Sequence, residues 1–528
     1  MIADLLDVLD PVAPALPVVA VLAPLVVALV LVVADRFPDP PTEGLSRPIA
    51  VGGAVVSAVA AGLAVLQRPE VDLPWIPAIG VRLDLAVDGI SAPLVLLTAV
   101  AGVVAVVIRY HEPERDHPTE EVTAPLDLGG RHTAQSLATY YGCLLVVMSG
   151  AMLAFLARDG IVFFIAFEMV LVPMWLLVAR HGDGTRAADR DGAAVRFILF
   201  TATGSTLMLV GILALATATG TSDMGAWVGR ADALDPRAQV VVAALLVIGL
   251  GMKIPVFPLH TWLPWVHSTA PTAGSVLLAA VLLKLGVYGM IRLVVAPLPN
   301  GFATISPVVA GFAVTGIVWA GLACLVERDL KRLIAWSSIA HLGFIVLALT
   351  AGTATGLQAA LFGNVAHGLI SALLFVVVGE LKHQWGTADL RTARAALREV
   401  APRMGFALVV GMAAAMGLPG LAGFWGEFGA LYAAWSPAAD RTEGWFRVFA
   451  LVAALGAVLA AAYAVRVLRE VWAGDRTTPL IGDARRVNAV VLGVLIACVV
   501  ALGVYPVPLL DLTEPAVSEL FALVGGAR

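Results

Sequence analysis

Charged residues are scarce in this chain. Asp, Glu, Lys and Arg make up 13% of its 528 residues, whereas hydrophobic residues make up 60% and the mean hydropathy is +0.93. A soluble domain carries about 25% charged residues. The composition therefore excludes an ordinary soluble protein and indicates a chain that crosses the lipid bilayer many times.

Cysteine and clusters of basic residues are also rare. Cys143, Cys324 and Cys498 lie far apart in apolar runs, and no pair has CxxC spacing. This pattern argues against Fe–S ligation and a disulfide framework, so we expect no metal and no cofactor in this chain. The net charge of −5 argues against nucleic-acid binding. The acidic N-terminal segment lacks the positive region of a cleavable signal peptide.

Lysine is scarce even among the cations, with four copies against 29 arginines. Yet Lys253 and Lys284 lie near the middle of two neighbouring membrane-length apolar segments. A lysine at that depth costs roughly 2.5–3.5 kcal/mol on insertion scales unless it faces the bundle interior or water. Buried lysine can release its proton, whereas arginine stays charged, so the choice indicates proton chemistry. The alternative is a structural role in which the lysines pair with buried carboxylates.

Apolar stretches of about 20 residues predict an all-α polytopic membrane protein with fourteen transmembrane helices. They lie near residues 12–34, 48–66, 86–108, 137–157, 160–180, 195–218, 238–262, 273–295, 303–325, 333–351, 357–380, 404–434, 446–472 and 488–510. Most Lys and Arg residues fall in the loops on one side, which predicts that both termini face outside. The charged loops Arg109–Arg131 and Lys382–Arg403 are then cytoplasmic.

Predicted spans seven and twelve contain residues that interrupt a helix. The interrupting residues are Pro255, Pro258, Gly417 and Pro419. The first two follow Lys253, and the second two precede Glu427. Such breaks persist in the bilayer only against protein or water. Since these spans have opposite orientations, the pattern predicts two inverted five-helix repeats, residues 137–295 and 303–473, within one transmembrane domain, 1–528. Ordinary proline kinks are the alternative.

Ionisable side chains recur within the predicted spans. They are Glu168, Lys253, Lys284, His341, His367 and Glu427, with His260 as a further relay candidate. A carboxylate among apolar residues is stable as an anion only beside a cation, so we expect Glu168 to pair with Lys253. Histidine titrates near neutral pH and suits a proton relay between Lys284 and Glu427.

Two alternatives remain for the histidines. Each can be a hydrogen-bonded residue of the protein interior. Haem ligation is disfavoured because His341 and His367 lie on different predicted helices and no second pair exists.

Five segments resemble motifs of the antiporter-like membrane subunits of respiratory complex I (NADH:quinone oxidoreductase), and especially those of its M-like subunits. They are FEMVLVPMW around Glu168, KIPVFPLHTWLPWVHSTAPTAGSVLLAAVLLKLGVYG over Lys253 and Lys284, DLKRLIAWSSIAHLGF with His341, NVAHGLISALLF with His367, and GLPGLAGFWGEF with Glu427. The resemblance covers roughly residues 85–470. Glu427 favours the M-like type because L-like and N-like paralogues usually carry lysine there. Trp265 departs from the pattern, replacing an acidic residue often found after WLP.

The resemblance implies a fourteen-helix fold with inverted repeats in a bacterial inner membrane. It implies Glu168 and Lys253 as an inner ion pair, the following lysine and histidines as a connecting axis, and Glu427 as the outlet-side group. It also implies a non-redox subunit that moves protons from the cytoplasm to the outside, beside L-like and N-like neighbours. FMN, Fe–S clusters and quinone are then expected in partner subunits. A subunit of an Mrp-type cation/proton antiporter and a structural scaffold of the membrane arm are the alternatives.

Overall fold

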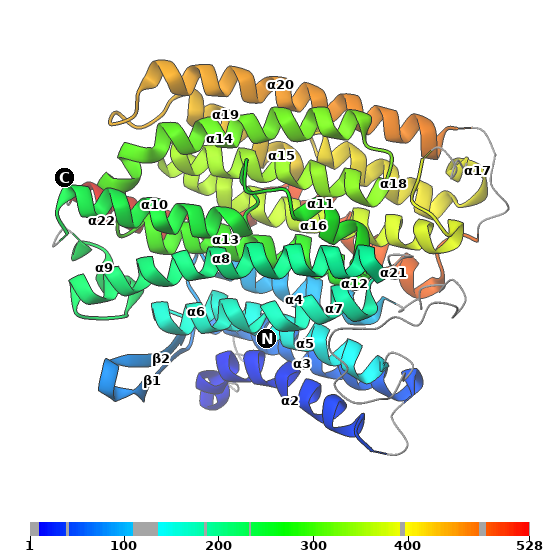
Figure 1. Ribbon diagram of the computed structural model, residues 1–528, viewed down its shortest axis with the longest axis horizontal. Coiled ribbons are helices and arrows are strands. Elements are labelled where there is room, and N and C mark those ends of the chain that lie inside the picture. The colour runs from blue at the N-terminus through cyan, green and yellow to red at the C-terminus, as the bar shows by residue number, and fades with distance from the viewer. Residues whose placement is uncertain are drawn as a thin grey trace.

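The helices of this protein run side by side in one bundle, with their axes close to horizontal in Figure 1. The computed structural model describes residues 10–37, 42–108, 136–183, 187–231, 234–390, 396–474 and 482–526. The loop Arg109–Arg131, which we predicted to be cytoplasmic, lies outside the described residues, as does part of the loop Lys382–Arg403.

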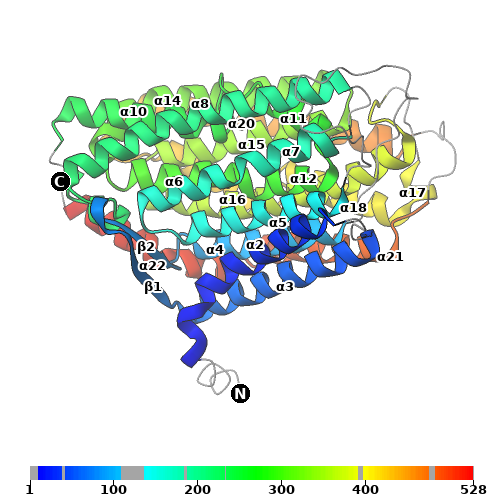
Figure 2. The same ribbon diagram turned by 60° about the horizontal axis from the view of Figure 1, so that its bottom comes forward.

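The N-terminal part of the bundle combines helices with a small hairpin. Its elements are η1 (Asp10–Ala15), α2 (Leu16–Ala34), α3 (Glu43–Gln67), β1 (Glu70–Ile76), η2 (Pro77–Ile79), β2 (Val81–Ala86) and α4 (Ala92–Val107). Strands β1 and β2 are antiparallel, with Glu70 opposite Ala86. The hairpin projects beside the bundle at the lower left of Figures 1 and 2, and it is an addition to the predicted all-helical fold.

The remaining elements are almost entirely helical. The central part contains α5 (Leu137–Leu156), α6 (Gly160–Met169), α7 (Leu171–His181), α8 (Ala187–Thr219), α9 (Met224–Trp227), α10 (Pro236–Lys253), α11 (Leu263–Thr269), α12 (Thr272–Leu277), η4 (Leu278–Leu282), α13 (Leu283–Met290) and η5 (Ile291–Val295). The last part contains α14 (Pro299–Val326), α15 (Leu330–Thr350), α16 (Ala354–Trp385), α17 (Leu397–Val400), α18 (Pro402–Ala415), α19 (Gly423–Trp435), α20 (Glu443–Val467), η6 (Leu468–Trp472), α21 (Arg486–Val504) and α22 (Val507–Gly526).

Helices lie at each of the fourteen predicted positions. Within the described residues, 12 helical segments are long and apolar enough to cross a membrane, and α4 and α18 are shorter apolar helices. The last predicted span, 488–510, is too long at its C-terminal end. Helix α21 ends at Val504 because Pro506 cannot donate a backbone hydrogen bond, and the separate helix α22 follows.

Helix α16 forms the centre of the bundle. Its most apolar 18-residue window is entirely buried, whereas a third of the corresponding window is buried in α20 and α21. It packs against α15, α18, α19 and α21 from the C-terminal part and against α4 and α12 from earlier parts. Figure 1 shows α20 along one edge of the bundle and α2 with α3 along the other. A polar side chain on α16 is therefore far from the lipid-facing surface.

Both predicted helix breaks are confirmed. Residues 254–262 separate α10 from α11, and residues 416–422 separate α18 from α19. A third interruption, at Val170 between α6 and α7, was not predicted. Pro173 explains it, because a proline ring clashes with the carbonyl group four residues earlier, here that of Met169.

Two short backbone connections have the same construction at opposite ends of the bundle. In each, the two residues that flank an aspartate before a helix form two backbone hydrogen bonds with the segment after the next long helix. The bonds are Gly160 N to Ser222 O (2.8 Å) and Met224 N to Arg158 O (2.9 Å), and Leu330 N to Ala388 O (3.0 Å) and Leu390 N to Arg328 O (2.9 Å). Asp159 and Asp329 cap the helices that follow. Helix α9, after the first connection, is at the left in Figure 1, and α17, after the second, is at the right.

Candidate functional site

Lys284 is a fully buried cation on a helix that alternates between α and π turns. The π turn η4 comes directly before the helix that carries Lys284. Turns of this kind are rare and frequently occur at functional sites. Lys284 Nζ donates a 2.9 Å hydrogen bond to the carbonyl oxygen of Ala279, within η4. The irregular helix thus supplies a backbone partner for an ammonium group that lies away from water.

His367 on α16 is the next polar group after Lys284. Lys284 Nζ contacts His367 Nδ1, and the other ring nitrogen, Nε2, lies 3.1 Å from Ser371 Oγ. His367 and Ser371 are four residues apart and so share one face of α16. Ser371 was not predicted as a site residue, because a serine in an apolar helix gives no distinctive sequence signal.

His341 on α15 continues the chain toward Glu427 on α19. The rings of His341 and His367 have centroids 5.6 Å apart. His341 Nε2 donates a 2.7 Å hydrogen bond to the carbonyl oxygen of Ala415 and lies 3.3 Å from Glu427 Oε1. Ala415 is the last residue of α18, so its carbonyl group is available because the helix ends there.

The break before α19 allows the Glu427 carboxylate to approach the backbone. Gly417 has φ of +68°, and a Cβ atom at this position would lie 2.6 Å from Glu427 Oε2. Glycine satisfies both the left-handed backbone and the close approach. Pro419 lies in the same non-helical segment. The predicted break at Gly417 therefore lies directly beside the carboxylate of Glu427, which was predicted as a site residue.

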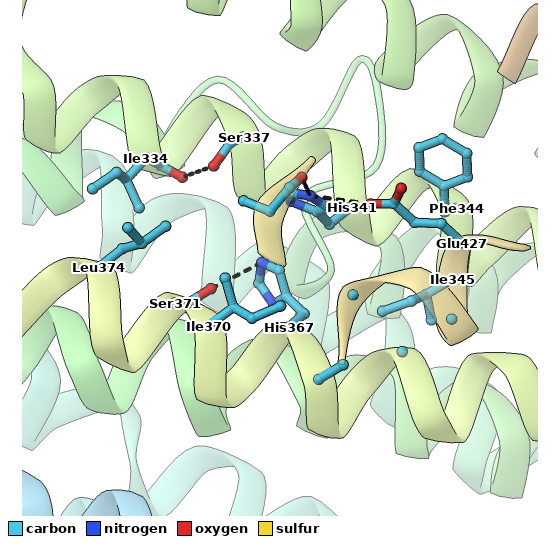
Figure 3. Close-up of a pocket in the computed structure, with 15 residues that line it drawn as sticks. Ile334, Ser337, His341, Phe344, Ile345, His367, Ile370, Ser371, Leu374 and Glu427 are labelled. Atoms are coloured by element: carbon cyan, nitrogen blue, oxygen red, sulfur yellow. Dashed lines mark hydrogen bonds and ion pairs between the residues drawn. The ribbon is translucent and has the colours of Figure 1, made fainter. Parts of the chain in front are cut away.

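A pocket lies between α15, α16, α18 and α19, and several of these polar side chains line it. It encloses about 450 Å³ of space between atoms, its opening included. His341, His367, Ser371 and Glu427 line it together with apolar side chains such as Ile334. Figure 3 shows the two imidazoles between Ser371 and Glu427. A mainly apolar pocket with a few converging polar groups is the form expected of a functional site.

Lys253 and Glu168 do not form the direct ion pair that the sequence predicts. Lys253 Nζ lies 4.8 Å from the centre of the Phe167 ring and 5.8 Å from that of Phe197, and within the part of the chain that the structure describes it has no hydrogen-bond partner. Glu168 Oε1 is also buried, and none of the described residues hydrogen-bonds to it. The aromatic faces hold the ammonium group instead of the carboxylate. Glu168 still lies within electrostatic range of Lys253.

His260 lies apart from the contacts between Lys284 and Glu427. It stands in the non-helical segment after α10, together with Pro255 and Pro258. Its ring stacks on Phe257 at 5.3 Å and lies 5.5 Å from the Trp336 ring. This environment is that of an aromatic cluster.

The remaining sequence arguments concerned metals and haem. Within the described residues, no group of three or more His, Cys, Asp or Glu side chains is arranged to hold a metal ion, and the three cysteines are free. His341 and His367 lie close together although they belong to different helices, so their separation in sequence was a weak argument. In the structure each imidazole contacts a charged side chain, Glu427 and Lys284 respectively.

Lys284, His367, His341 and Glu427 thus place an amine, two imidazoles and a carboxylate in succession. Each can bind and release a proton, and their neighbours are close enough for one protonation to affect the next. Because the four groups come from α13, α16, α15 and α19, the succession runs across the bundle rather than along one helix. The arrangement is suited to proton movement inside an apolar protein.

Comparisons with known proteins identify the family and the fold of this chain. The family model described as "NADH:quinone oxidoreductase/Mrp antiporter, TM" matches residues 157–464. NADH-quinone oxidoreductase subunit M of Pseudomonas aeruginosa is 32% identical over 466 residues, which are 86% of this chain and 85% of the relative. A chain of respiratory complex I from Thermus thermophilus has a TM-score of 0.81 at 24% identity, covering 96% of this chain and 99% of that one. A chain of the Mrp complex from Dietzia sp. DQ12-45-1b has a TM-score of 0.79 at 22% identity, covering 95% of this chain and 52% of that one.

Proposed function

Because this chain belongs to the family of NADH:quinone oxidoreductase and Mrp antiporter transmembrane subunits, we propose that it is a proton-translocating, non-redox membrane subunit of an NADH:quinone oxidoreductase. The observation that carries the proposal is the continuous succession from Lys284 through His367 and His341 to Glu427. It joins groups from four helices deep inside the bundle. A protein that only held neighbouring subunits together would have no need of such buried titratable groups.

The succession has a simple electrostatic consequence. Lys284 and His367 are in contact, and two adjacent cations repel each other in a medium of low dielectric constant. A proton that reaches this pair is therefore favoured to leave toward His341, which lies beside Glu427. Glu168 and Lys253 lie upstream in this scheme, and a change in their separation alters the field at Lys284.

The direction and assembly of the transport follow from the same proposal. Protons move from the cytoplasm to the outside of a bacterial inner membrane, with both termini of the chain outside. Each proton moved against 100 mV requires about 2.3 kcal/mol, which must reach this subunit through its neighbours. We place L-like and N-like subunits beside it, and FMN, Fe–S clusters and quinone in other partner subunits, with no cofactor in this chain.

The proposal includes two inverted five-helix repeats, residues 137–295 and 303–473. The matching backbone connections at Asp159 and Asp329 support it, because each lies at the start of the second helix of its repeat. The matching breaks after Lys253 and before Glu427 support it as well. Such repeats place functional groups at the broken helices, near the middle of the membrane.

Transport in inverted membrane vesicles tests the function. We expect Lys284→Met and Glu427→Gln each to lower NADH-driven proton uptake at least tenfold, with assembly of the complex retained on a native gel. Arg447→Lys is the control, since Arg447 pairs with Glu443 on an exposed helix face and should transport normally. Full proton uptake by both site variants would overturn the proposal and favour the scaffold.

An Mrp-type antiporter subunit is the second candidate, favoured by the structural similarity to a chain of the Mrp complex. The two candidates differ in what drives proton movement, which is exchange against sodium in the antiporter and NADH oxidation in the oxidoreductase. Proton exchange that depends on sodium and proceeds without NADH would support it. Co-purification of flavin and Fe–S absorbance with NADH oxidation, after extraction in mild detergent, would support the NADH:quinone oxidoreductase instead.

A further inference from the structure

Two lysines outside the chain from Lys284 to Glu427 meet at one carboxylate. Lys331 is fully buried, and its Nζ lies 2.8 Å from Asp183 Oδ2 and 2.5 Å from the carbonyl oxygen of Ala270. Lys382 Nζ lies 3.4 Å from the other carboxylate oxygen of Asp183 and donates to the carbonyl oxygen of Ser268 at 2.9 Å. With Lys253 and Lys284, these are all four lysines of the chain. Every lysine is therefore buried or partly buried.

The Asp183 site lies at one end of the bundle and is open there. Asp183 follows α7, and Lys331 lies in the first turn of α15, next to the backbone connection between Leu330 and Ala388 at the end of the bundle where α17 lies in Figure 1. The Asp183 side chain is 23% exposed, whereas that of Lys331 is 0% exposed. A proton can therefore reach Asp183 from outside the bundle, and Lys331 is the first fully buried group behind it.

His267 is a buried imidazole near this site. It is fully buried on α11, and neither of its ring nitrogens has a hydrogen-bond partner among the described residues. Its ring stacks on that of Phe375 with centroids 4.5 Å apart. It lies within electrostatic range of both Lys331 and Lys284. A buried imidazole without a partner destabilises the fold, so its presence calls for a functional explanation.

The geometry of α16 shows that His267 lies in line with the central chain. His367, Ser371 and Phe375 follow one another at intervals of four residues and therefore share one face of the helix. Ser371 Oγ contacts His367 Nε2, and the His267 ring covers Phe375 one turn further on. Lys331 Nζ bonds to Ala270, three residues after His267. The polar groups thus extend from Glu427 to the end of the bundle at Asp183.

We propose that Asp183, Lys331 and His267 form a proton-exchange port that connects the end of the bundle to the Lys284–His367 pair. This inference depends on the proposed function. A proton passes from the Lys331 ammonium group through water to a ring nitrogen of His267, and Lys331 is reprotonated through Asp183. His267 then gives its proton to the Lys284–His367 pair, so that no electron is transferred and each donor regains its proton. Lys382 holds the Ser268 carbonyl and is not part of the port.

The test distinguishes the release of a proton by Lys331 from a purely structural role of its positive charge. Lys331→Arg keeps the charge and the attraction to Asp183, but arginine does not release its proton. His267→Phe keeps a ring of similar size stacked on Phe375 and removes the titratable nitrogens. Lys382→Arg is the matched control, being the same substitution at the other cation beside Asp183. We expect the first two variants to lower proton uptake at least fivefold at normal assembly, and the control to retain it.

The outcomes distinguish this inference from the proposed function. Loss of uptake in Lys284→Met together with normal uptake in Lys331→Arg and His267→Phe would overturn the port alone. Normal uptake in all of these variants would overturn both. If His267→Phe fails to assemble, Lys331→Arg still decides, because it preserves the charge that holds Asp183. Equal losses in Lys331→Arg and Lys382→Arg would show that both lysines act structurally and would also reject the port.

Discussion

The Lys253 ammonium group lies against aromatic rings, and no carboxylate among the described residues hydrogen-bonds to it. A buried ammonium group without a hydrogen-bonded partner has lost its hydration without compensation, and an apolar side chain of similar size removes that cost. We therefore expect Lys253→Met to unfold at the same or a higher temperature than the native protein while losing proton transport. Thermal unfolding in detergent, with vesicle transport measured alongside, checks both effects. A markedly lower unfolding temperature would mean that Lys253 holds the fold together.

For individual residues, the sequence predicts which of them belong to the site better than it predicts their contacts. The identity of Lys284 and Glu427 as site residues follows from the high cost of a charge among apolar neighbours. The contact between Lys253 and Phe167 does not, because attraction between opposite charges made Glu168 the natural expectation. His267 and Lys331 were missed since each lies near a predicted helix end, where a polar residue is unremarkable.

Helices α16 and α19 approach each other closely, and this contact positions Glu427 beside His341. A Cβ atom at Gly426 would lie 2.7 Å from Gly363 Cα. Gly426→Ala should therefore separate the helices, destabilise the protein by about 1–3 kcal/mol and weaken transport. Gly444→Ala is the control, since a Cβ there meets nothing within 4 Å. Unchanged unfolding and transport in Gly426→Ala would show that the helices do not need this approach.

Helix irregularities were predictable only where proline or glycine marks them. Pro255 and Gly417 identify the breaks of α10 and α18, because neither residue type continues a helix easily. Pro173 carries the same signal for the interruption at Val170, but a membrane-spanning helix often tolerates a proline, so this break was not predicted. The π turn before Lys284 has no such mark, since it contains neither proline nor glycine.

For the molecule as a whole, hydropathy determines the number and order of the helices, whereas long-range packing determines which of them meet. The fourteen predicted positions follow from the length of a bilayer crossing. The central position of α16 does not follow, because its sequence is no more apolar than that of α20, which lies at the edge. Contacts between α13, α15, α16 and α19 depend on side-chain shapes that a single sequence does not reveal.

The transverse arrangement of the polar groups predicts how variants combine. If Lys284 and Glu427 act one after the other in a single proton pathway, blocking either group stops the same protons. Lys284→Met combined with Glu427→Gln should then lower uptake no further than the more severe single variant. Independent routes would instead multiply the losses, so that two tenfold effects would give about a hundredfold effect. Initial rates of proton uptake in vesicles with equal amounts of assembled complex distinguish the two cases. Multiplying losses would contradict a single route across the bundle, even if each single variant behaved as expected.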